Sequence, residues 1–272
     1  MLELPEAITL STQLQNAVLG RIVSHVCPPT KEHKFCWYHG DVGEYNNKIQ
    51  GQEIVLAEAF GIYTEIAFKN GQKLCINDGV NVRLVKEEEA PRAYQLMICF
   101  TDGDALVFTV AMYGGIVLHS GAYDNEYYLK SRAAIMPFSK EFEMYYRELF
   151  ENSKSTLSVK AFLATEQRFP GIGNGVLQDI LFNARLHPKR KIGTLSEEDK
   201  NRLFDQILIT LQDMIEKGGR DTEKDLYGKA GGYKTIMSKN GVKNGCPVCG
   251  GEITKEAYLG GSVYYCKNCQ PI

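Results

Sequence analysis

Four cysteines near the C-terminus carry the most specific chemistry in this sequence. They form two Cys-x-x-Cys pairs, Cys246 with Cys249 and Cys266 with Cys269, and sixteen residues separate the pairs. Each pair lets two thiolates reach one ion from a tight turn, and two pairs complete a tetrahedral zinc site with four cysteine ligands. Because four protein thiolates leave no open coordination position, we predict one structural zinc ion per chain. The ribbon between the pairs is predicted to be a hairpin that turns at Gly260-Gly261.

A glycine-rich turn in the middle of the chain is the second candidate. Gly171, Gly173 and Gly175 precede an apolar pattern of helical period over 177–184, and Pro188 is predicted to stop that helix. Backbone N–H groups at such a helix start point outward with the positive end of the dipole behind them, which suits a phosphate. A structural turn without any ligand fits these residues equally well.

Glu3 is the third candidate, because a carboxylate can serve as a general base. It lies just before a predicted amphipathic helix over 5–19, which has Pro5 in its first turn. A glutamate in that place also suits a helix cap. The residues alone leave both interpretations open.

The composition indicates which half of the chain would contact a polyanion, and it shows no sign of a membrane span. The chain has 272 residues, 44% of them hydrophobic, and a net charge of −2. Residues 1–138 hold 11 Lys+Arg and 16 Asp+Glu, whereas residues 139–272 hold 20 and 17. We therefore expect the C-terminal half to face any polyanion. No run of 18 apolar residues and no basic signal-peptide start are present, so we expect no membrane span and a cytoplasmic location, nucleoid-associated if the source is bacterial.

The pattern of elements predicts an α+β fold. Short apolar runs and Asn-Gly or Asp-Gly turns over 21–120 predict an antiparallel sandwich or barrel, since no βαβ alternation occurs. Helices are predicted from about residue 131 onward, including a long one that Ser196 begins. We predict three parts: an N-terminal β-sandwich, 1–130; a helical domain, 131–236; and a zinc ribbon, 237–272. Trp37, with Phe35 and Tyr38, is interpreted as packing rather than as a base-stacking residue. The four cysteines outside the C-terminal pairs lack ligand spacing and are expected to be buried thiols; they are Cys27, Cys36, Cys75 and Cys99.

Taken together, these parts resemble the formamidopyrimidine-DNA glycosylase and endonuclease VIII family. The motifs that carry the resemblance are Glu3-Leu4-Pro5-Glu6, Gly171-Ile172-Gly173-Asn174, Leu186-His187-Pro188 and Tyr265-Cys266…Cys269-Gln270. The resemblance implies a DNA repair protein with a helix–two-turn–helix module, monomeric, that bends double-stranded DNA and flips out a damaged base. Its partner would be duplex DNA with a damaged base or an abasic site.

The sequence departs from that family at several functional positions. Leu2 stands where the family has its proline nucleophile, Gly61-Ile62-Tyr63 lacks the family's phosphate-binding lysine, and Gly260-Gly261-Ser262 lacks an arginine at the hairpin tip. The residues expected to fill the gap left by the flipped base are also altered. Val80 stands in place of a methionine, and Met112-Tyr113 in place of an Arg-Phe pair.

Three functions follow from this combination. The favoured one is a DNA glycosylase in which Glu3 activates a water that attacks the sugar C1′. The second is a non-catalytic binder of damaged DNA, and the third is a weak lyase that uses the Met1 amine or a lysine. The expected DNA contacts are Asn174, Gly173, Lys189, Arg220, Lys267 and the gap-filling residues Val80, Met112 and Tyr113.

Overall fold

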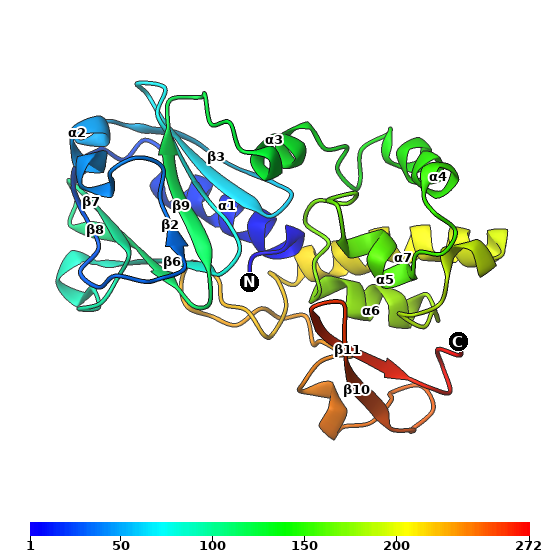
Figure 1. The fold of residues 1–272 in the computed structure, drawn as a ribbon. Coiled ribbons are helices and arrows are strands. Elements are labelled where there is room, and N and C mark those ends of the chain that lie inside the picture. The colour runs from blue at the N-terminus through cyan, green and yellow to red at the C-terminus, as the bar shows by residue number, and fades with distance from the viewer.

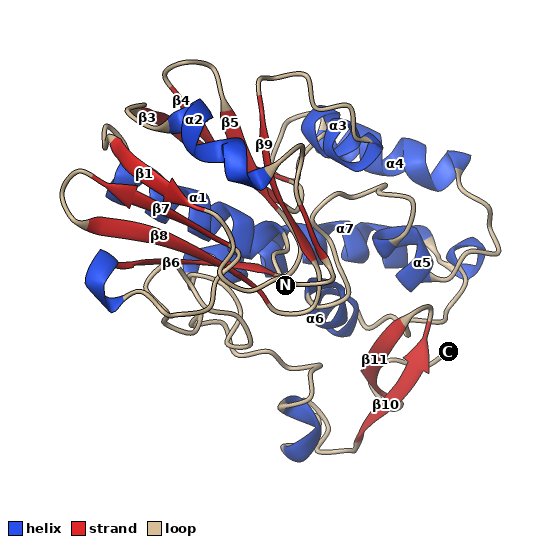
Figure 2. Ribbon diagram, turned by 60° about the vertical axis from the view of Figure 1, so that its left-hand side comes forward, coloured by secondary structure: helices blue, strands red, loops and turns tan.

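The computed structural model describes residues 1–272, and its N-terminal part is a sandwich of two β-sheets (Figures 1 and 2). One sheet has the strand order β1-β7-β8-β6 and the other β2-β9-β5-β4-β3. The first sheet contains β1 Val23–Cys27, β6 Val80–Lys86, β7 Leu96–Phe100 and β8 Asp104–Val110. The second contains β2 Cys36–Trp37, β3 Ile54–Phe60, β4 Tyr63–Phe68, β5 Lys73–Ile76 and β9 Gly114–His119.

The predicted antiparallel arrangement is confirmed with one exception. Two-residue β2 pairs with β9 in parallel, with Trp37 opposite Gly115. Every other strand pair in the sandwich is antiparallel. A strand of two residues carries too short a pattern to be recognised in a sequence, since strand prediction needs four or more alternating residues.

The first helix joins the two halves of the molecule. Helix α1, Leu4–Val18, packs against β3 and β4 on one side and against α7 on the other. Its Leu10 and Leu14 lie in the apolar core of the sandwich, whereas Leu4 lies in the core of the helical part. The N-terminal residues are therefore fixed between the two halves, close to the start of α6.

The middle of the chain forms a helical part that lies beside the sandwich in Figure 1. Ser196 begins the longest helix with a capping box, in which the Ser196 hydroxyl accepts the Asp199 N–H at 3.1 Å. None of the helices has the length and apolar character needed to cross a membrane. The helices are α2 Tyr45–Ile49, which belongs to the sandwich, then α3 Glu126–Ala133, α4 Phe142–Asn152, α5 Val159–Ala164, α6 Val176–Asn183 and α7 Glu197–Glu216. Single 3-10 turns lie at Val42–Glu44, Glu87–Glu89, Ile192–Thr194 and Gly241–Lys243.

The C-terminal ribbon is an antiparallel hairpin beside α6, at the end of the molecule away from the sandwich (Figures 1 and 2). Strand β10, Ile253–Tyr258, pairs with β11, Gly261–Cys266. Its two turn residues are Leu259 and Gly260, both with positive φ of 49° and 73°. The turn lies one residue before the predicted Gly260-Gly261, because the pairing of Tyr258 with Gly261 leaves two residues, the loop length that favours positive φ at both.

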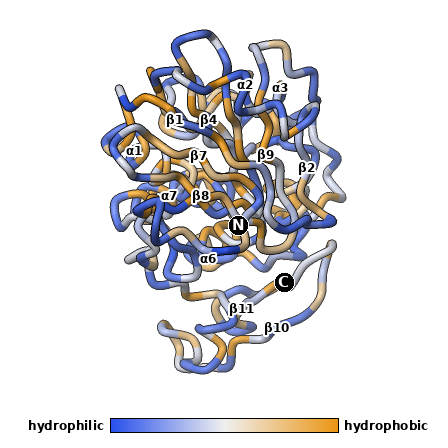
Figure 3. The backbone as a smooth tube through the Cα atoms, turned by 90° about the vertical axis from the view of Figure 1, so that its left-hand side faces the viewer, coloured by the Kyte–Doolittle hydropathy of each residue, from blue (hydrophilic) through white to orange (hydrophobic).

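The two large apolar clusters lie in the sandwich and in the helical part, where Figure 3 has most of its orange segments, and the ribbon shares a smaller cluster with α6. The sandwich core lies between the two sheets and α1, and the helical core is centred on α6 and α7. The predicted α+β class is thus confirmed.

Candidate functional site

The carboxylate of Glu3 caps helix α6. Glu3 is buried, its Oε1 accepts the Gly175 N–H at 2.8 Å and its Oε2 accepts the Val176 N–H at 2.7 Å. These are the free donors at the start of α6, where the helix dipole favours a negative charge. The phosphate hypothesis is therefore corrected for the Gly175 and Val176 N–H groups, because the anion at these two donors is the protein's own carboxylate.

The glycines of the turn are required by this close approach. A Cβ on Gly173 would lie 2.7 Å from the Glu3 carboxyl carbon, and one on Gly175 would lie 1.5 Å from Nη1 of Arg220. Gly171 has φ +94°, and its Cβ would meet Leu4 Cβ at 2.7 Å. The glycine pattern therefore admits the N-terminal segment into the start of α6.

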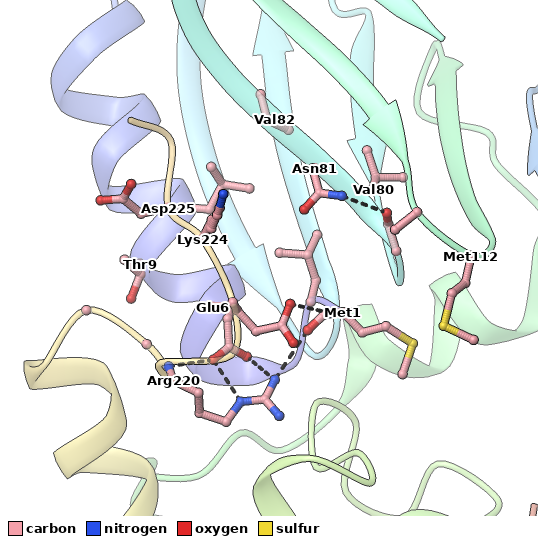
Figure 4. Close-up of a pocket in the computed structure, with 17 residues that line it drawn as sticks. Met1, Glu6, Thr9, Val80, Asn81, Val82, Met112, Arg220, Lys224 and Asp225 are labelled. Carbon is pink, nitrogen blue, oxygen red and sulfur yellow. Dashed lines mark hydrogen bonds and ion pairs between the residues drawn. The ribbon is translucent and has the colours of Figure 1, made fainter. Parts of the chain in front are cut away.

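Arg220 belongs to the same buried cluster, which Figure 4 shows in part. Its Nε and Nη2 donate to the two carboxylate oxygens of Glu6 at 2.9 and 2.7 Å, and its Nη1 lies 3.6 Å from Glu3 Oε1. Burial raises the pKa of Glu3, and the Arg220 charge opposes that rise. The prediction that Arg220 contacts DNA is corrected, because this guanidinium is buried and committed to Glu6 and Glu3.

A cavity of about 120 Å³ lies beside this cluster (Figure 4). It is bounded by the first residues of the chain, the start of β6, the β8–β9 turn and the loop after α7. In it, the Met1 amine donates to the Glu223 carboxylate at 2.5 Å. The residues that line it are Met1, Leu2, Glu6, Thr9, Leu10, Gly79, Val80, Asn81, Val82, Ala111, Met112, Gly218, Gly219, Arg220, Glu223, Lys224 and Asp225.

The predicted gap-filling residues divide into a buried one and two exposed ones. Val80 is 3% exposed and packs in the sandwich core, so it cannot enter a DNA gap and that prediction is wrong. Met112 is 64% exposed and Tyr113 is 37% exposed, on the turn between β8 and β9. Backbone bonds hold this turn, since the Gly79 N–H donates to the Tyr113 carbonyl at 2.9 Å and the Ala111 N–H donates to the Gly79 carbonyl at 3.0 Å.

Asn174 and Gln178 connect α6 to the ribbon. The Asn174 Nδ2 and the Gln178 Nε2 both donate to the Ser262 carbonyl, at 3.0 and 2.9 Å, and the Tyr264 N–H donates to Gln178 Oε1 at 3.1 Å. The sequence reasoning missed Gln178. The available signal was its place one helical turn after Asn174, which puts both side chains on one face.

The two predicted lysine contacts differ in their surroundings. Lys189 donates to the Glu256 carboxylate at 2.7 Å, so its charge is paired within the protein. Lys267, in the second Cys-x-x-Cys turn, is exposed. Gly173 is half-buried against Glu3. Of these residues, Lys267 has the most accessible side chain for a phosphate.

The structure brings the four C-terminal thiols together. Their sulfur atoms all lie within 4.8 Å of one another, with Cys246 and Cys269 at 3.6 Å and Cys249 and Cys266 at 3.4 Å. This donor set can hold one metal ion with a closed tetrahedral shell. Gln270 anchors the ribbon, because its Oε1 accepts the Cys266 N–H at 3.0 Å and its Nε2 donates to the Leu186 carbonyl at 2.9 Å.

A second buried polar cluster lies within the sandwich and is centred on Glu65. Its carboxylate accepts from Lys73 at 2.9 Å and from the Tyr128 hydroxyl at 2.7 Å, and it faces His119 Nε2 at 3.5 Å. Burial by itself would raise the pKa of Glu65, but the bonds from His119, Tyr128 and Lys73 outweigh it and lower that pKa to about 2. This network joins β4, β5, β9 and α3, and it does not line the cavity.

Comparison with known proteins places this geometry in context. Residues 134–225 match the family model for the formamidopyrimidine-DNA glycosylase H2TH domain. A formamidopyrimidine-DNA glycosylase of Cytobacillus firmus is 27% identical over 99% of this chain and 100% of its own length. One of Thermus thermophilus is 26% identical over 99% of this chain and 98% of its own length.

The chain is thus similar to formamidopyrimidine-DNA glycosylases over nearly its whole length, and its residues 134–225 match the H2TH domain of that family. The predicted resemblance is thereby confirmed.

Solved structures of the family show the same fold. The Lactococcus lactis Fpg in complex with DNA that contains an abasic site has a TM-score of 0.83 at 23% identity, and covers 99% of this chain and 100% of that chain. The MutM (Fpg) protein of Thermus thermophilus has a TM-score of 0.80 at 23% identity, over 98% of both chains.

Two of the departures from this family have local structural reasons. The Leu2 side chain packs against the sandwich core, and its N–H donates to the Asp78 carbonyl at 2.6 Å. Gly61 has φ +56°, and a Cβ there would lie 2.9 Å from Pro170 Cβ. Ile62, which follows it, packs against an aromatic cluster. Apolar packing therefore occupies the sequence positions where the family resemblance places a proline and a lysine.

Proposed function

We propose that this protein is a base excision repair DNA glycosylase that binds duplex DNA with a damaged base or an abasic site. It hydrolyses the N-glycosidic bond of the damaged base with a water that Glu3 activates. The observation that carries the proposal is the cavity that Glu6 and Arg220 line beside the Glu3 carboxylate, with the exposed Met112 in its wall. Support also comes from the names of the relatives and from family neighbours solved in complex with abasic-site and FAPY-dG DNA.

In this mechanism the water oxygen forms a bond to C1′ and the C1′–N bond breaks. Glu3 takes one proton from the water; the damaged base leaves with the C1′–N electron pair and takes up a proton from solvent, and Glu3 then releases its proton to solvent. A carboxylate is a better base near neutral pH when its pKa is raised, and burial raises the pKa of Glu3. Each Glu3 oxygen has a second lone pair beside the one that holds Gly175 or Val176.

A water nucleophile fits the residue at position 2. Leu2 supplies no secondary amine, and its backbone N–H is bonded to the Asp78 carbonyl. The alternative nucleophile, the Met1 amine, is paired with Glu223. We therefore favour hydrolysis by water over weak lyase chemistry through an amine.

A specific observation favours a second candidate, a damaged-DNA binder without catalysis. Both Glu3 oxygens accept backbone N–H groups, and Arg220 lies 3.6 Å away, so the carboxylate already has a structural task. In that case the cavity and the exposed Met112 recognise the lesion, and no bond is broken.

One experiment separates these functions. Duplexes that carry single oxidised, alkylated or crosslinked bases are incubated with the protein, with and without borohydride, and released base and protein–DNA crosslinks are measured. We expect base release, no crosslink, and a strand that stays intact until alkali is added. Glu3→Gln should abolish release and leave binding to an abasic-site analogue within a few fold, whereas the control Glu143→Gln, an exposed change on α4, should retain release. A crosslink at Met1 would support the lyase, and lesion binding without release would support the binder.

We also propose that the C-terminal cysteines hold zinc and that Asn174, Gly173, Lys189, Lys267, Met112 and Tyr113 contact DNA. Four clustered thiolates with no other ligand are the donor set of structural zinc. When bound, the ion would fix the ribbon beside α6 and would take no part in the reaction.

Asn174→Ala should weaken binding to intact and abasic duplexes alike. The proposed working division of the chain is 1–130, 131–236 and 237–272, and the proposed species is a monomer.

A further inference from the structure

Four exposed apolar side chains form a continuous strip next to the cavity, which we call the aromatic ledge. Trp37 is 53% exposed and Phe35 is 49% exposed, and they join the exposed Met112 and Tyr113. The Trp37 and Tyr113 rings contact each other, with centroids 6.3 Å apart and planes tilted by 56°. The sequence interpretation of Trp37 as a packing residue is therefore corrected, since over half of this side chain faces solvent.

Strand geometry explains why these aromatic residues are outside. Successive side chains of a strand point to opposite faces, and Cys36 packs against the sandwich core. Phe35 and Trp37, on either side of it, consequently point outward. The β2 segment is fixed to β9 by the Gly114 N–H, which donates to the Phe35 carbonyl at 3.0 Å, and by the pairing of Trp37 with Gly115.

The rest of the ledge is held equally firmly. The β5–β6 turn clamps the start of β9, because Asn77 Oδ1 accepts the Gly115 N–H at 2.7 Å and the Gly79 N–H donates to the Tyr113 carbonyl. The Trp37 and Tyr113 rings are thus presented from a rigid edge. A preorganised aromatic surface loses little conformational entropy when a flat partner stacks on it.

Position and charge indicate the partner. The ledge is continuous with the cavity, because Met112 belongs to both. At its other end, the Lys34 ammonium lies 5.4 Å from the centroid of the Phe35 ring. An aromatic strip with a cation at one end and the cavity at the other suits a nucleobase attached to a phosphate backbone.

We propose that Trp37 stacks on an unpaired nucleobase next to the gap that base flipping leaves in the duplex. This inference rests on the proposed function, because it assumes lesion-bearing DNA at the cavity. Extruding one nucleotide unstacks its neighbours and leaves a partner base unpaired, and contact with an aromatic face offsets part of that loss. The ledge would then extend the gap-filling role of Met112 and Tyr113 to a third side chain from a different strand.

Trp37 is the only tryptophan in the chain, so its fluorescence reports this contact directly. The full-length protein is titrated with a duplex that carries an abasic-site analogue and with the intact duplex of the same sequence. Binding is followed separately by the anisotropy of a dye at the far end of the DNA. We expect strong quenching of Trp37 with the abasic duplex and weaker quenching with the intact one.

Three variants give the affinity test. Trp37→Ala should bind the abasic duplex roughly 10-fold more weakly, as expected when one base–aromatic stack is lost. Trp37→Phe should stay within about 3-fold of the parent, since a ring remains. The control Tyr127→Ala removes another exposed aromatic residue, on α3, which lies on the side of the molecule opposite the ribbon in Figures 1 and 2, and should bind like the parent. Circular dichroism verifies that each variant is folded.

The outcomes separate this inference from the proposed function. Lesion-selective binding with unchanged Trp37 emission, or with unaltered affinity of Trp37→Ala, would overturn stacking and leave the glycosylase proposal standing. Equal weakening by Trp37→Ala and Trp37→Phe would also overturn it. If Trp37 emission changes with protein concentration and does not respond to DNA, the ledge would instead be a contact between copies of this chain. Absence of lesion-selective binding would overturn both proposals.

Discussion

Glu3 and Val176 lie 173 positions apart in the chain, yet the Val176 N–H donates to the Glu3 carboxylate at 2.7 Å. This bond and its neighbour from Gly175 fix the first residues of the protein to the start of α6. The residue proposed as the catalytic base thus also fixes the junction between the sandwich and the helical part. Stability and activity must therefore be measured together for any Glu3 variant.

Glu3→Ala should lower the free energy of unfolding by about 2–4 kcal/mol, because it leaves the Gly175 and Val176 N–H groups without acceptors and removes a partner of Arg220. Glu3→Gln keeps an acceptor oxygen and should cost about 1–2 kcal/mol. Urea denaturation measures both values. The exposed Glu143→Gln should change stability by no more than about 0.5 kcal/mol. A Glu3→Ala variant as stable as the parent would show that this cap is not formed in solution.

The Glu65 network should make stability depend on acid pH. Its folded-state pKa of about 2 lies below the ordinary value of 4.5, so the stabilisation is complete above about pH 4.5 and is lost as pH falls toward 2. The full loss amounts to roughly 3 kcal/mol. The difference in unfolding free energy between the parent and Glu65→Gln should therefore shrink by that amount between pH 5 and 2. Glu53→Gln, which removes a surface pair with Lys69, should give a difference that is nearly flat over the same range. A flat difference for Glu65→Gln would contradict the prediction.

Metal analysis should find one zinc ion per chain. Cys266→Ser should abolish it, loosen the ribbon and weaken DNA binding, while the near-ultraviolet signal of the sandwich stays as in the parent. Cys36→Ser, a change outside the cluster, should retain full zinc. Removal of zinc by a chelator should reproduce the effect of Cys266→Ser. A zinc content near zero with an ordered ribbon would refute the assignment of this metal.

Met112 and Val80 should respond in opposite ways to truncation. Met112→Ala removes an exposed side chain and should alter stability by less than about 0.5 kcal/mol, yet weaken binding to abasic duplex several-fold. Val80→Ala opens space in the core and should cost about 2 kcal/mol, with little change in affinity. Denaturation and DNA-binding measurements on the same samples test both statements. Reduced affinity for Val80→Ala with unchanged affinity for Met112→Ala would contradict this division of roles.

Local patterns in the sequence were sufficient for the elements and for the metal ligands. Helix α1 was predicted within one residue at each end. The Cys-x-x-Cys spacing predicted the cluster of four sulfur atoms, since ligands two residues apart are brought together by one turn. The family also followed from short motifs, because each motif lies within one element or turn.

The exposure and the partners of individual side chains depended on contacts between residues that are far apart in the chain. The sequence left Glu3 as a cap or a base and assigned Arg220 to DNA. The family resemblance placed Val80 in a DNA gap, and Trp37 was interpreted as a packing residue. Folding pairs Arg220 with Glu6 across 214 positions, turns Val80 inward on β6 and leaves Trp37 outside on a two-residue strand. Exposure and charge pairing are properties of neighbours in space, and those neighbours come from distant parts of the chain. Sequence periodicity reports only which face of an element is apolar, so the partners of each polar or aromatic side chain became visible only in the tertiary structure.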